Sequence, residues 1–232
     1  MKSLPPGFKA IVLGATGAIG GAFEKALLRM PACAGVIGLG RQTDPAFDLE
    51  DEASIAACAR AVAPAGPFDL IVDATGALHI DGVAPEKRLQ DLNADRLSRA
   101  FTINAIGPAL LMKHFIPLLP AKSRCMFATL SARVGSITDN RKGGWYGYRA
   151  SKAARNMLLR TAAIEACRQR PEAVFVALQP GTVRSRLSAP FAAGADAMDP
   201  DVSAALLLGA IDALPAGGEA VFIDYRGQRI EW

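Results

Sequence analysis

The chain has 232 residues, of which 51% are hydrophobic and 21% are charged, and its formal net charge is +4. This composition suits one large globular domain or two small ones and excludes an intrinsically disordered protein. The mild positive charge fits an anionic small ligand. The sequence lacks the basic stripe with interleaved aromatic residues that a nucleic-acid interface requires.

The sequence shows no sign of a membrane span, a targeting segment or a metal site. It has no stretch of about 18 apolar residues, and its first residues are too broken by prolines for a signal peptide. The four cysteines are widely spaced without a CxxC pair, and we interpret His79 and His114 as surface or packing residues. We therefore expect a reduced, cytoplasmic protein without a bound metal.

Short apolar runs alternate with segments of helical spacing along the chain. Each run is continuous rather than alternating, as expected for strands buried on both faces of a parallel sheet. The predicted strands span 10–13, 36–39, 70–72, 125–130, 174–178 and 220–223, with 47–49 as a candidate for a short seventh. The predicted helices span 20–30, 51–62, 95–119, 144–168 and 200–214, with an adjustment expected at Pro108.

The alternation predicts right-handed crossovers and a doubly wound α/β fold. We expect a single Rossmann-type domain over residues 1–232, with a parallel sheet of about seven strands and helices on both faces. Residues 186–199 break the pattern with prolines and many alanines directly after a strand. Ligands enter such folds at the carboxyl ends of the strands, so we interpret 186–199 as a substrate loop.

A glycine-rich turn follows the first predicted strand and opens the first helix. Its sequence is Gly14-Ala15-Thr16-Gly17-Ala18-Ile19-Gly20. Gly14 allows a tight turn, Gly17 lets the backbone approach a pyrophosphate, and Gly20 permits close packing, while the helix N-terminus stabilises the anion. In this context the turn predicts a dinucleotide site, with an ordinary strand–helix connection as the alternative.

The end of the second predicted strand favours NADP(H) over NAD(H). NAD sites place a carboxylate there, on the ribose of the adenosine. This chain has Gly38-Leu39-Gly40-Arg41 instead, and the Arg41 guanidinium can pair with a 2′-phosphate. The alternative is a solvated arginine.

Tyr148 and Lys152 lie four residues apart in the predicted helix 144–168, so they share one face. A nearby ammonium favours the phenolate and lowers the phenol pKa from its ordinary value of about 10. The pair therefore predicts a general acid/base, with a surface tyrosine beside a lysine as the alternative. Tyr146 faces elsewhere on a helix, and Trp145 could line the substrate mouth or simply pack.

These motifs resemble the short-chain dehydrogenase/reductase family over nearly the whole chain. The glycine turn is similar to the family's TGxxxGIG, with Leu13 in place of the threonine, Ala18 in place of the middle glycine and Gly17 one place early. Three more segments resemble the Asp–hydrophobic pair at the adenine, the NNAG segment and the PGxVxT segment: Asp48-Leu49, Asp73-Ala74-Thr75-Gly76-Ala77 and Pro180-Gly181-Thr182-Val183-Arg184-Ser185. Residues 131–137 and 143–146 look most like the C-factor-like and sniffer-like carbonyl reductase branch.

The resemblance implies a role for each matching residue. Tyr148 donates the proton to the alkoxide, Lys152 lowers the phenol pKa and binds the nicotinamide ribose, and Asn104 holds a water that returns the proton. The implied cofactor-binding residues are Gly14, Thr16, Gly17, Ala18, Ile19, Gly20, Arg41, Asp48, Leu49, Ala74, Thr75, Gly76, Tyr148, Lys152, Pro180, Gly181, Thr182, Val183 and Ser185.

The catalytic serine is the weakest match to the family. Members usually have two serines at the end of this strand, and the second is catalytic. If Ser131 matches the first, Ala132 occupies the catalytic place and has no hydroxyl. Ser131, which ends the strand, is our candidate and Ser136 is the reserve. A catalyst that polarises the carbonyl with Tyr148 alone is the third possibility.

The expected function is NADP(H)-dependent hydride transfer between the nicotinamide and a small carbonyl or secondary alcohol. The alternative is a dinucleotide-binding sensor or signalling protein with little turnover, motivated by Ala18, Ala132 and the altered segment 73–76. A sugar-nucleotide epimerase shares the glycine spacing but needs a larger C-terminal domain than the residues after Gly181 provide. The resemblance also implies a homodimer or homotetramer.

Overall fold

The computed structural model describes residues 1–185 and 197–232. Their strands form one parallel sheet in the order β2-β1-β3-β4-β5-β6. The strands are β1 (Phe8–Leu13), β2 (Cys33–Leu39), β3 (Leu70–Asp73), β4 (Cys125–Leu130), β5 (Ala173–Gln179) and β6 (Val221–Asp224). The strand order reverses at β1, which lies between β2 and β3, and ligands bind at such a reversal in open α/β sheets.

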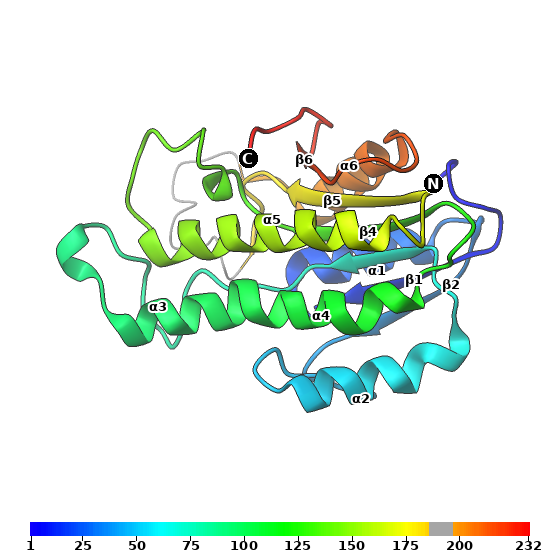
Figure 1. The fold of residues 1–232 in the computed structure, drawn as a ribbon, viewed down its shortest axis with the longest axis horizontal. Coiled ribbons are helices and arrows are strands. Elements are labelled where there is room, and N and C mark those ends of the chain that lie inside the picture. The colour runs from blue at the N-terminus through cyan, green and yellow to red at the C-terminus, as the bar shows by residue number, and fades with distance from the viewer. Residues whose placement is uncertain (186–196) are drawn as a thin grey trace.

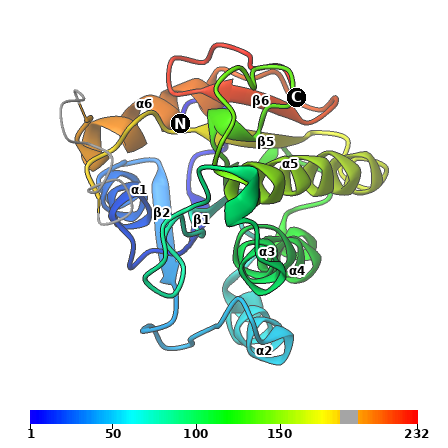
Figure 2. The ribbon, with the colours of Figure 1, turned by 90° about the vertical axis from the view of Figure 1, so that its left-hand side faces the viewer.

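Helices cover both faces of this sheet, as Figures 1 and 2 show. They are α1 (Ala18–Leu28), α2 (Glu52–Val62), α3 (Ala94–Phe101), α4 (Gly107–Phe115), α5 (Tyr146–Ala166) and α6 (Pro200–Asp212). Short 3₁₀ turns span Ala63–Ala65, Leu89–Asp91, Ile116–Leu118 and Arg133–Gly135, and a π-helical turn spans Thr102–Ile106. Helices α1 and α6 pack on one face, and α2, α4 and α5 pack on the other.

The alternation of side chains along each strand builds two separate hydrophobic layers. In β4, Cys125 and Phe127 belong to the layer under α2, α4 and α5, whereas Met126 and Ala128 belong to the layer under α1 and α6. Every residue of β4 is buried. Burial on both faces explains why the strands appear in the sequence as continuous apolar runs.

Two elements differ from the sequence prediction. The described residues form six strands rather than about seven, because 47–49 make no strand pairing and Phe47 instead packs into the core. The predicted helix 95–119 is divided by the π-helical turn. Pro108 has no N–H to donate to the carbonyl four residues earlier, so the helix widens just before it.

The predicted substrate loop 186–199 lies largely outside the described residues, since 186–196 are not part of them. The two flanks of this segment are joined by backbone hydrogen bonds. Met198 N donates to the Thr182 carbonyl at 2.8 Å, and Arg184 N donates to the Met198 carbonyl at 2.9 Å. The chain on both sides of 186–196 is therefore fixed at the end of β5.

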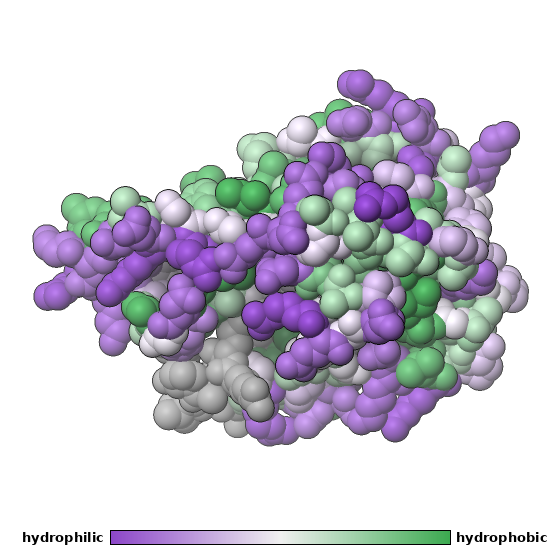
Figure 3. Space-filling view, turned by 90° about the horizontal axis from the view of Figure 1, so that it is seen from below, coloured by the Kyte–Doolittle hydropathy of each residue, from purple (hydrophilic) through white to green (hydrophobic). Residues whose placement is uncertain are grey.

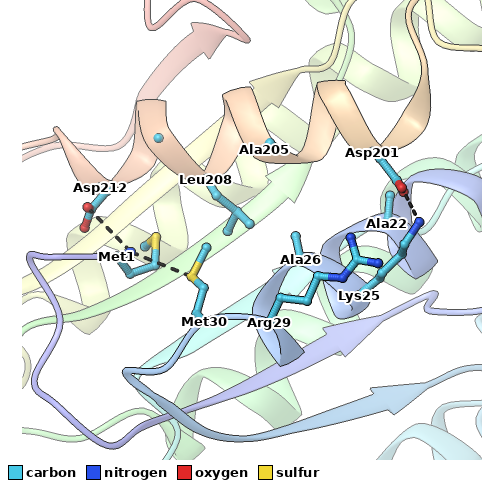
Figure 4. Close-up of a pocket in the computed structure, with 11 residues that line it drawn as sticks. Met1, Ala22, Lys25, Ala26, Arg29, Met30, Asp201, Ala205, Leu208 and Asp212 are labelled. Carbon is cyan, nitrogen blue, oxygen red and sulfur yellow. Dashed lines mark hydrogen bonds and ion pairs between the residues drawn. The ribbon is translucent and has the colours of Figure 1, made fainter.

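A cavity of about 400 Å³ lies between α1 and α6. Lys25 pairs with Asp201 at one end of it, and Asp212 lies 3.8 Å from the N-terminal ammonium at the other (Figure 4). It contains none of the residues that the sequence motifs assign to a dinucleotide or to catalysis. This cavity is therefore separate from the candidate active site.

The surface seen from below in Figure 3 is largely hydrophilic, with hydrophobic patches between the charged residues. Within residues 1–185 and 197–232, none of the helices has the combined length and apolar character of a membrane-spanning segment. On α5, Met157 and Ile164 are 65% and 54% exposed, and they lie seven residues apart on one face of the helix.

Candidate active site

The motif segments meet at one edge of the sheet. All strands are parallel, so the segments that follow β1, β3, β4 and β5 leave the sheet at the same edge. These segments are 14–17, 74–77, 131–136 and 180–185. The fold thus brings together residues that lie far apart in the sequence.

The glycine turn has the geometry of an anion cradle. Gly14 has a φ of +82°, and a Cβ on it would lie 3.1 Å from the Ala74 carbonyl carbon. A Cβ on Gly20 would overlap the Gly14 carbonyl oxygen, so close packing requires glycine there. Helix α1 begins at Ala18 with no side-chain cap and no acidic residue in its first turn. Its N–H groups and dipole can therefore receive a phosphate.

The end of β2 lies beside this turn. A Cβ on Gly40 would lie 3.2 Å from Thr16 Oγ1, and Arg41 is exposed directly after it. Further along, Asp48 accepts a hydrogen bond from Glu50 N at 3.0 Å, and Leu49 packs against Gly107. Arg41 is therefore available to a 2′-phosphate beside the glycine turn, while Leu49 contributes to packing.

Asn104 lies fully buried in the π-helical turn. Its Oδ1 accepts from Ala77 N at 2.9 Å, and its Nδ2 donates to the Ala77 carbonyl at 2.8 Å. The side chain is thus used to hold the segment after β3. Pro108 has no N–H for the Asn104 backbone carbonyl, which leaves that oxygen without its usual helical donor.

Helix α5 begins with an unusual left-handed run. Gly143, Gly144 and Trp145 have φ values of 62°, 66° and 55°, and Trp145 is the non-glycine member. Glu86 holds this start: its carbonyl accepts from Trp145 N at 2.5 Å, and its carboxylate accepts from Gly147 N at 3.0 Å. A Cβ on Gly147 would lie 3.0 Å from Glu86 Oε1. No sequence motif pointed to Glu86, although it fixes the turn that carries Tyr148.

Tyr148 and Lys152 lie side by side, as their spacing predicted. Lys152 Nζ is 5.6 Å from the centre of the Tyr148 ring and donates to the Leu130 carbonyl at 3.0 Å. Lys152 is 3% exposed, Tyr148 is half-buried, and the Trp145 ring meets the Tyr148 ring edge-on at 6.2 Å between centroids. Trp145 therefore packs against the candidate acid/base.

Burial is the largest influence on the electrostatics of the pair. Burial raises the pKa of Tyr148 to about 12, and the charge that opposes this rise is Arg155 rather than Lys152. Burial, followed by repulsion from Arg155, holds the pKa of Lys152 well below its ordinary value, against the attraction of Asp73. That Lys152 lowers the phenol pKa stays a prediction from the sequence.

Arg155 is the centre of a buried network that the sequence analysis missed. It is fully buried and donates from Nε to Thr129 Oγ1 at 2.7 Å, from Nη1 to the Thr75 carbonyl at 2.8 Å, and from Nη2 to the Asp73 carboxylate. Asp73 also accepts from Thr75 N at 3.0 Å, from Thr75 Oγ1 at 2.6 Å and from Thr129 Oγ1 at 2.9 Å. An aspartate that ends an otherwise apolar strand was the available signal.

The two candidate serines are both buried and both hydrogen-bonded. Ser131 Oγ donates to Asn156 Oδ1 at 2.7 Å, and Ser136 Oγ accepts from Asp139 N at 3.1 Å. The single proton of Ser131 is therefore directed to α5. Ala132, which follows it, provides no hydroxyl.

The segment after β5 is held from two sides. Ser203 of α6 donates to the Pro180 carbonyl at 2.8 Å. Gly181 has a φ of +81°, and a Cβ on it would lie 3.1 Å from the Tyr225 ring. Val183 is buried. The backbone at 180–183 is thus rigidly placed at the same edge as the glycine turn.

Comparison with known proteins identifies the family. A family model described as enoyl-(acyl carrier protein) reductase matches residues 33–223. The C-signal protein of Myxococcus xanthus is 34% identical over 168 residues, which make up 72% of this chain and 94% of that protein. The chain belongs to the short-chain dehydrogenase/reductase family. Members of this family are NAD(P)-dependent oxidoreductases that act on CH–OH or C=O groups.

Solved structures share the fold of this short-chain dehydrogenase/reductase over almost its full length. The NADPH-bound carbonyl reductase from chicken fatty liver has a TM-score of 0.82 at 23% identity, covering 99% of this chain and 100% of that one. The carbonyl reductase Sniffer of D. melanogaster has a TM-score of 0.78 at 22% identity, covering 97% and 99%. The family and fold predicted from the sequence are confirmed.

The burial of Lys152 predicts a pH-dependent cost to stability. Between the lowered pKa of folded Lys152 and its unfolded value of about 10.4, the unfolded chain binds a proton that the folded protein does not. Stability therefore rises with pH in that window, and the cost persists at lower pH. Lys152→Met removes this cost, so its stability relative to the wild type should be greatest at neutral pH and decline by up to about 1.4 kcal/mol per pH unit as the pH approaches 10.

Urea denaturation between pH 7 and pH 10 measures the difference. Loss of the hydrogen bond to Leu130 costs about 1 kcal/mol at every pH. The test is therefore how the stability difference between Lys152→Met and the wild type changes with pH. Lys122→Met, at an exposed lysine, should follow the wild type throughout. A constant difference between Lys152→Met and the wild type over this range would contradict a lowered Lys152 pKa.

Proposed function

We propose that this short-chain dehydrogenase/reductase is an NADP(H)-dependent enzyme that transfers hydride between the nicotinamide and a small carbonyl or secondary alcohol. One observation carries the proposal: Tyr148, Lys152 and Asn104 converge beside the anion cradle. Lys152 Nζ and Asn104 Oδ1 lie 3.1 and 3.0 Å from the position that a Cβ on Gly76 would take. Gly76 belongs to the segment next to Gly14, so the acid/base group and the cradle share one edge.

In the proposed reaction the nicotinamide supplies the hydride, and the chain supplies position, charge and the proton. Tyr148, with a pKa of about 12, is protonated at neutral pH and is therefore in the form that reduction requires. Lys152 would bind the nicotinamide ribose, and the Asn104 carbonyl would hold the water that returns the proton. Ser131 would steady the oxyanion only after its hydroxyl turns away from Asn156.

Tyr148→Phe tests the acid/base assignment. Removal of the proton donor should reduce carbonyl reduction by about 10²- to 10⁴-fold, because general acid catalysis contributes that much. NADPH binding, followed by fluorescence titration, should be retained. Tyr146→Phe, two residues away, should keep nearly full activity. Reduction by Tyr148→Phe at the wild-type rate would exclude this mechanism.

We propose NADP(H) rather than NAD(H) because Arg41 is exposed directly after Gly40, which lies against Thr16, and because the residues on either side of Arg41 carry no carboxylate. The NADPH bound to the chicken carbonyl reductase is consistent with this choice. Arg41→Glu should weaken NADPH binding by about tenfold or more, because a charged hydrogen bond to the phosphate is lost and a repulsion is gained.

The matched measurement is the affinity for NADH, which lacks the 2′-phosphate and should change little in Arg41→Glu. Arg60→Glu, at an exposed arginine of α2, controls for the change in net charge. An equal loss of affinity for NADPH and NADH in Arg41→Glu would show that Arg41 does not bind the 2′-phosphate.

A dinucleotide-binding sensor or signalling protein is the second candidate. The relative named C-signal, Ala132 in the family's catalytic place and the Ser131 hydroxyl directed to Asn156 all favour it. A broad carbonyl and alcohol panel separates the two functions. Tight NADPH binding with no oxidation of NADPH by any compound would support the sensor.

We also propose a homodimer or homotetramer that covers the exposed face of α5. Met157 and Ile164 are exposed there as large apolar side chains, and a second copy could bury them. The double variant Met157→Glu/Ile164→Glu should therefore shift the mass measured by light scattering to that of a monomer. Leu28→Glu, at a residue 64% exposed on α1, should leave the mass unchanged. A wild-type monomer would contradict the proposal.

A further inference from the structure

Arg155 lies on the same face of α5 as the candidate acid/base pair. Tyr148, Lys152 and Arg155 are spaced at i, i+4 and i+7, which places them in one row along the helix. We propose that Arg155, held by Asp73, is a positioning residue that supplies the fixed positive charge beside Tyr148 and Lys152 and so sets the charge state of that pair. The inference rests on the proposed function, because it concerns the pair that would move the proton.

The two cations meet at Gly76. A Cβ on this glycine would lie 3.1 Å from Lys152 Nζ and 3.6 Å from Arg155 Nη1. Gly76 has a φ of +135°, a backbone conformation that side chains disfavour. Both cationic groups therefore border the same small space above the end of β3, together with Asn104 Oδ1.

The charges around this space do not balance. The ionisable groups that face Lys152 are Tyr148 and Arg155 on α5 itself and Asp73 at the end of β3. The other elements against it contribute neutral groups: the Asn104 amide, the Leu130 carbonyl and Gly135. Among the described residues, no carboxylate forms a salt bridge with Lys152. One carboxylate thus serves two buried cationic side chains.

Asp73 is committed to Arg155 rather than to Lys152. Its Oδ2 accepts hydrogen bonds from Arg155 Nη2 and Thr129 Oγ1. Its Oδ1 accepts hydrogen bonds from the backbone N–H and the hydroxyl of Thr75. The guanidinium remains protonated at all relevant pH values, whereas a buried ammonium can lose its proton. Of the two cations, Arg155 is therefore the permanent one, and Lys152 is the one whose charge responds to it.

This arrangement has consequences for both members of the pair. A permanent positive charge favours the phenolate of Tyr148, which must form when the proton leaves, and disfavours the ammonium of Lys152. Arg155 opposes the rise that burial causes in the pKa of Tyr148 and adds to the fall that burial causes in the pKa of Lys152. Because Arg155 is held by Asp73, Thr75 and Thr129 before any substrate arrives, its charge needs no rearrangement during the reaction.

The experiment measures the titration of Lys152 directly, by NMR of protein labelled at lysine Cε. Lys152→Met identifies the resonance. Replacement of Asp73 or Arg155 alone can leave a buried charge without its partner, so the main variant is the neutral pair Asp73→Asn/Arg155→Met. Lys152 should titrate at a higher pH in this variant than in the wild type, because the repulsion from Arg155 that is lost exceeds the attraction of Asp73 that is lost with it.

Arg155→Lys separates charge from hydrogen bonding. The introduced lysine cannot donate to Thr129, Thr75 and Asp73 together, but its ammonium can pair with Asp73, and its own Cε resonance reports whether it is charged. Where it is charged, Lys152 should titrate below its value in the neutral pair. Should the neutral pair fail to fold, Asp73→Asn provides the opposite shift, because Lys152 should then titrate lower than in the wild type. An unchanged Lys152 titration in a folded Asp73→Asn/Arg155→Met or Asp73→Asn protein overturns the inference. Equal Lys152 titrations in the neutral pair and in an Arg155→Lys protein whose introduced lysine is charged would also overturn it.

Kinetics connect this charge to the proposed reaction. For a carbonyl that the wild type reduces, kcat/KM should fall about tenfold in the neutral pair and recover in Arg155→Lys, with NADPH affinity unchanged in both. The experiments distinguish a failure of the proposed function from a failure of the inference about Arg155. A wild type that reduces no carbonyl contradicts the proposed function, while the NMR titration still decides whether Arg155 sets the charge of Lys152.

Discussion

The ion pair between Arg155 and Asp73 joins two parts of the site that lie far apart in the sequence. Its two partners are 82 residues apart, and Thr75 and Thr129 add the ends of β3 and β4 to the same network. Removing two charges from water is costly, and attraction repays this only when the remaining hydrogen-bonding atoms are also satisfied. Here each nitrogen of the guanidinium donates and both carboxylate oxygens accept, so the network fixes α5 against the sheet.

Glu86 holds the other end of this helical segment. It accepts hydrogen bonds from the backbone of Trp145 and Gly147, directly before the row of functional side chains begins at Tyr148. Tyr148 and Lys152 therefore lie between two anchored points, one at the start of α5 and one at Arg155. A proton donor placed this way keeps its orientation without help from substrate, which is the condition for preorganised catalysis.

The sequence was most informative where one local pattern determines the structure. Continuous apolar runs located all six strands, and the i, i+4 spacing placed Tyr148 beside Lys152. The prediction of a seventh strand at 47–49 was wrong because Phe47 belongs to a loop and fills the hydrophobic core from there. Pro108 indicated an irregular helix, but a missing donor does not determine whether the chain kinks or widens.

The rest depends on tertiary contacts that no local pattern contains. Glu86 is an ordinary loop carboxylate until the fold brings it to α5, and Arg155 resembles any polar residue of a helix. The state of Lys152 depends on such contacts as well. Spacing alone placed an ammonium beside the phenol, whereas burial and the neighbouring guanidinium lower the pKa of the lysine itself.

The serine position shows how these contacts bear on the proposed chemistry. Ala132 cannot donate a hydrogen bond, and Ser131 gives its proton to Asn156, one residue after Arg155 on α5. In this arrangement the phenol of Tyr148 is the donor that remains for a substrate oxygen. A single donor must both polarise the carbonyl and deliver the proton, so its charge environment matters more than in a site with two donors. The buried guanidinium, which favours the phenolate left behind, is therefore the feature that would compensate for a hydroxyl turned away from the substrate.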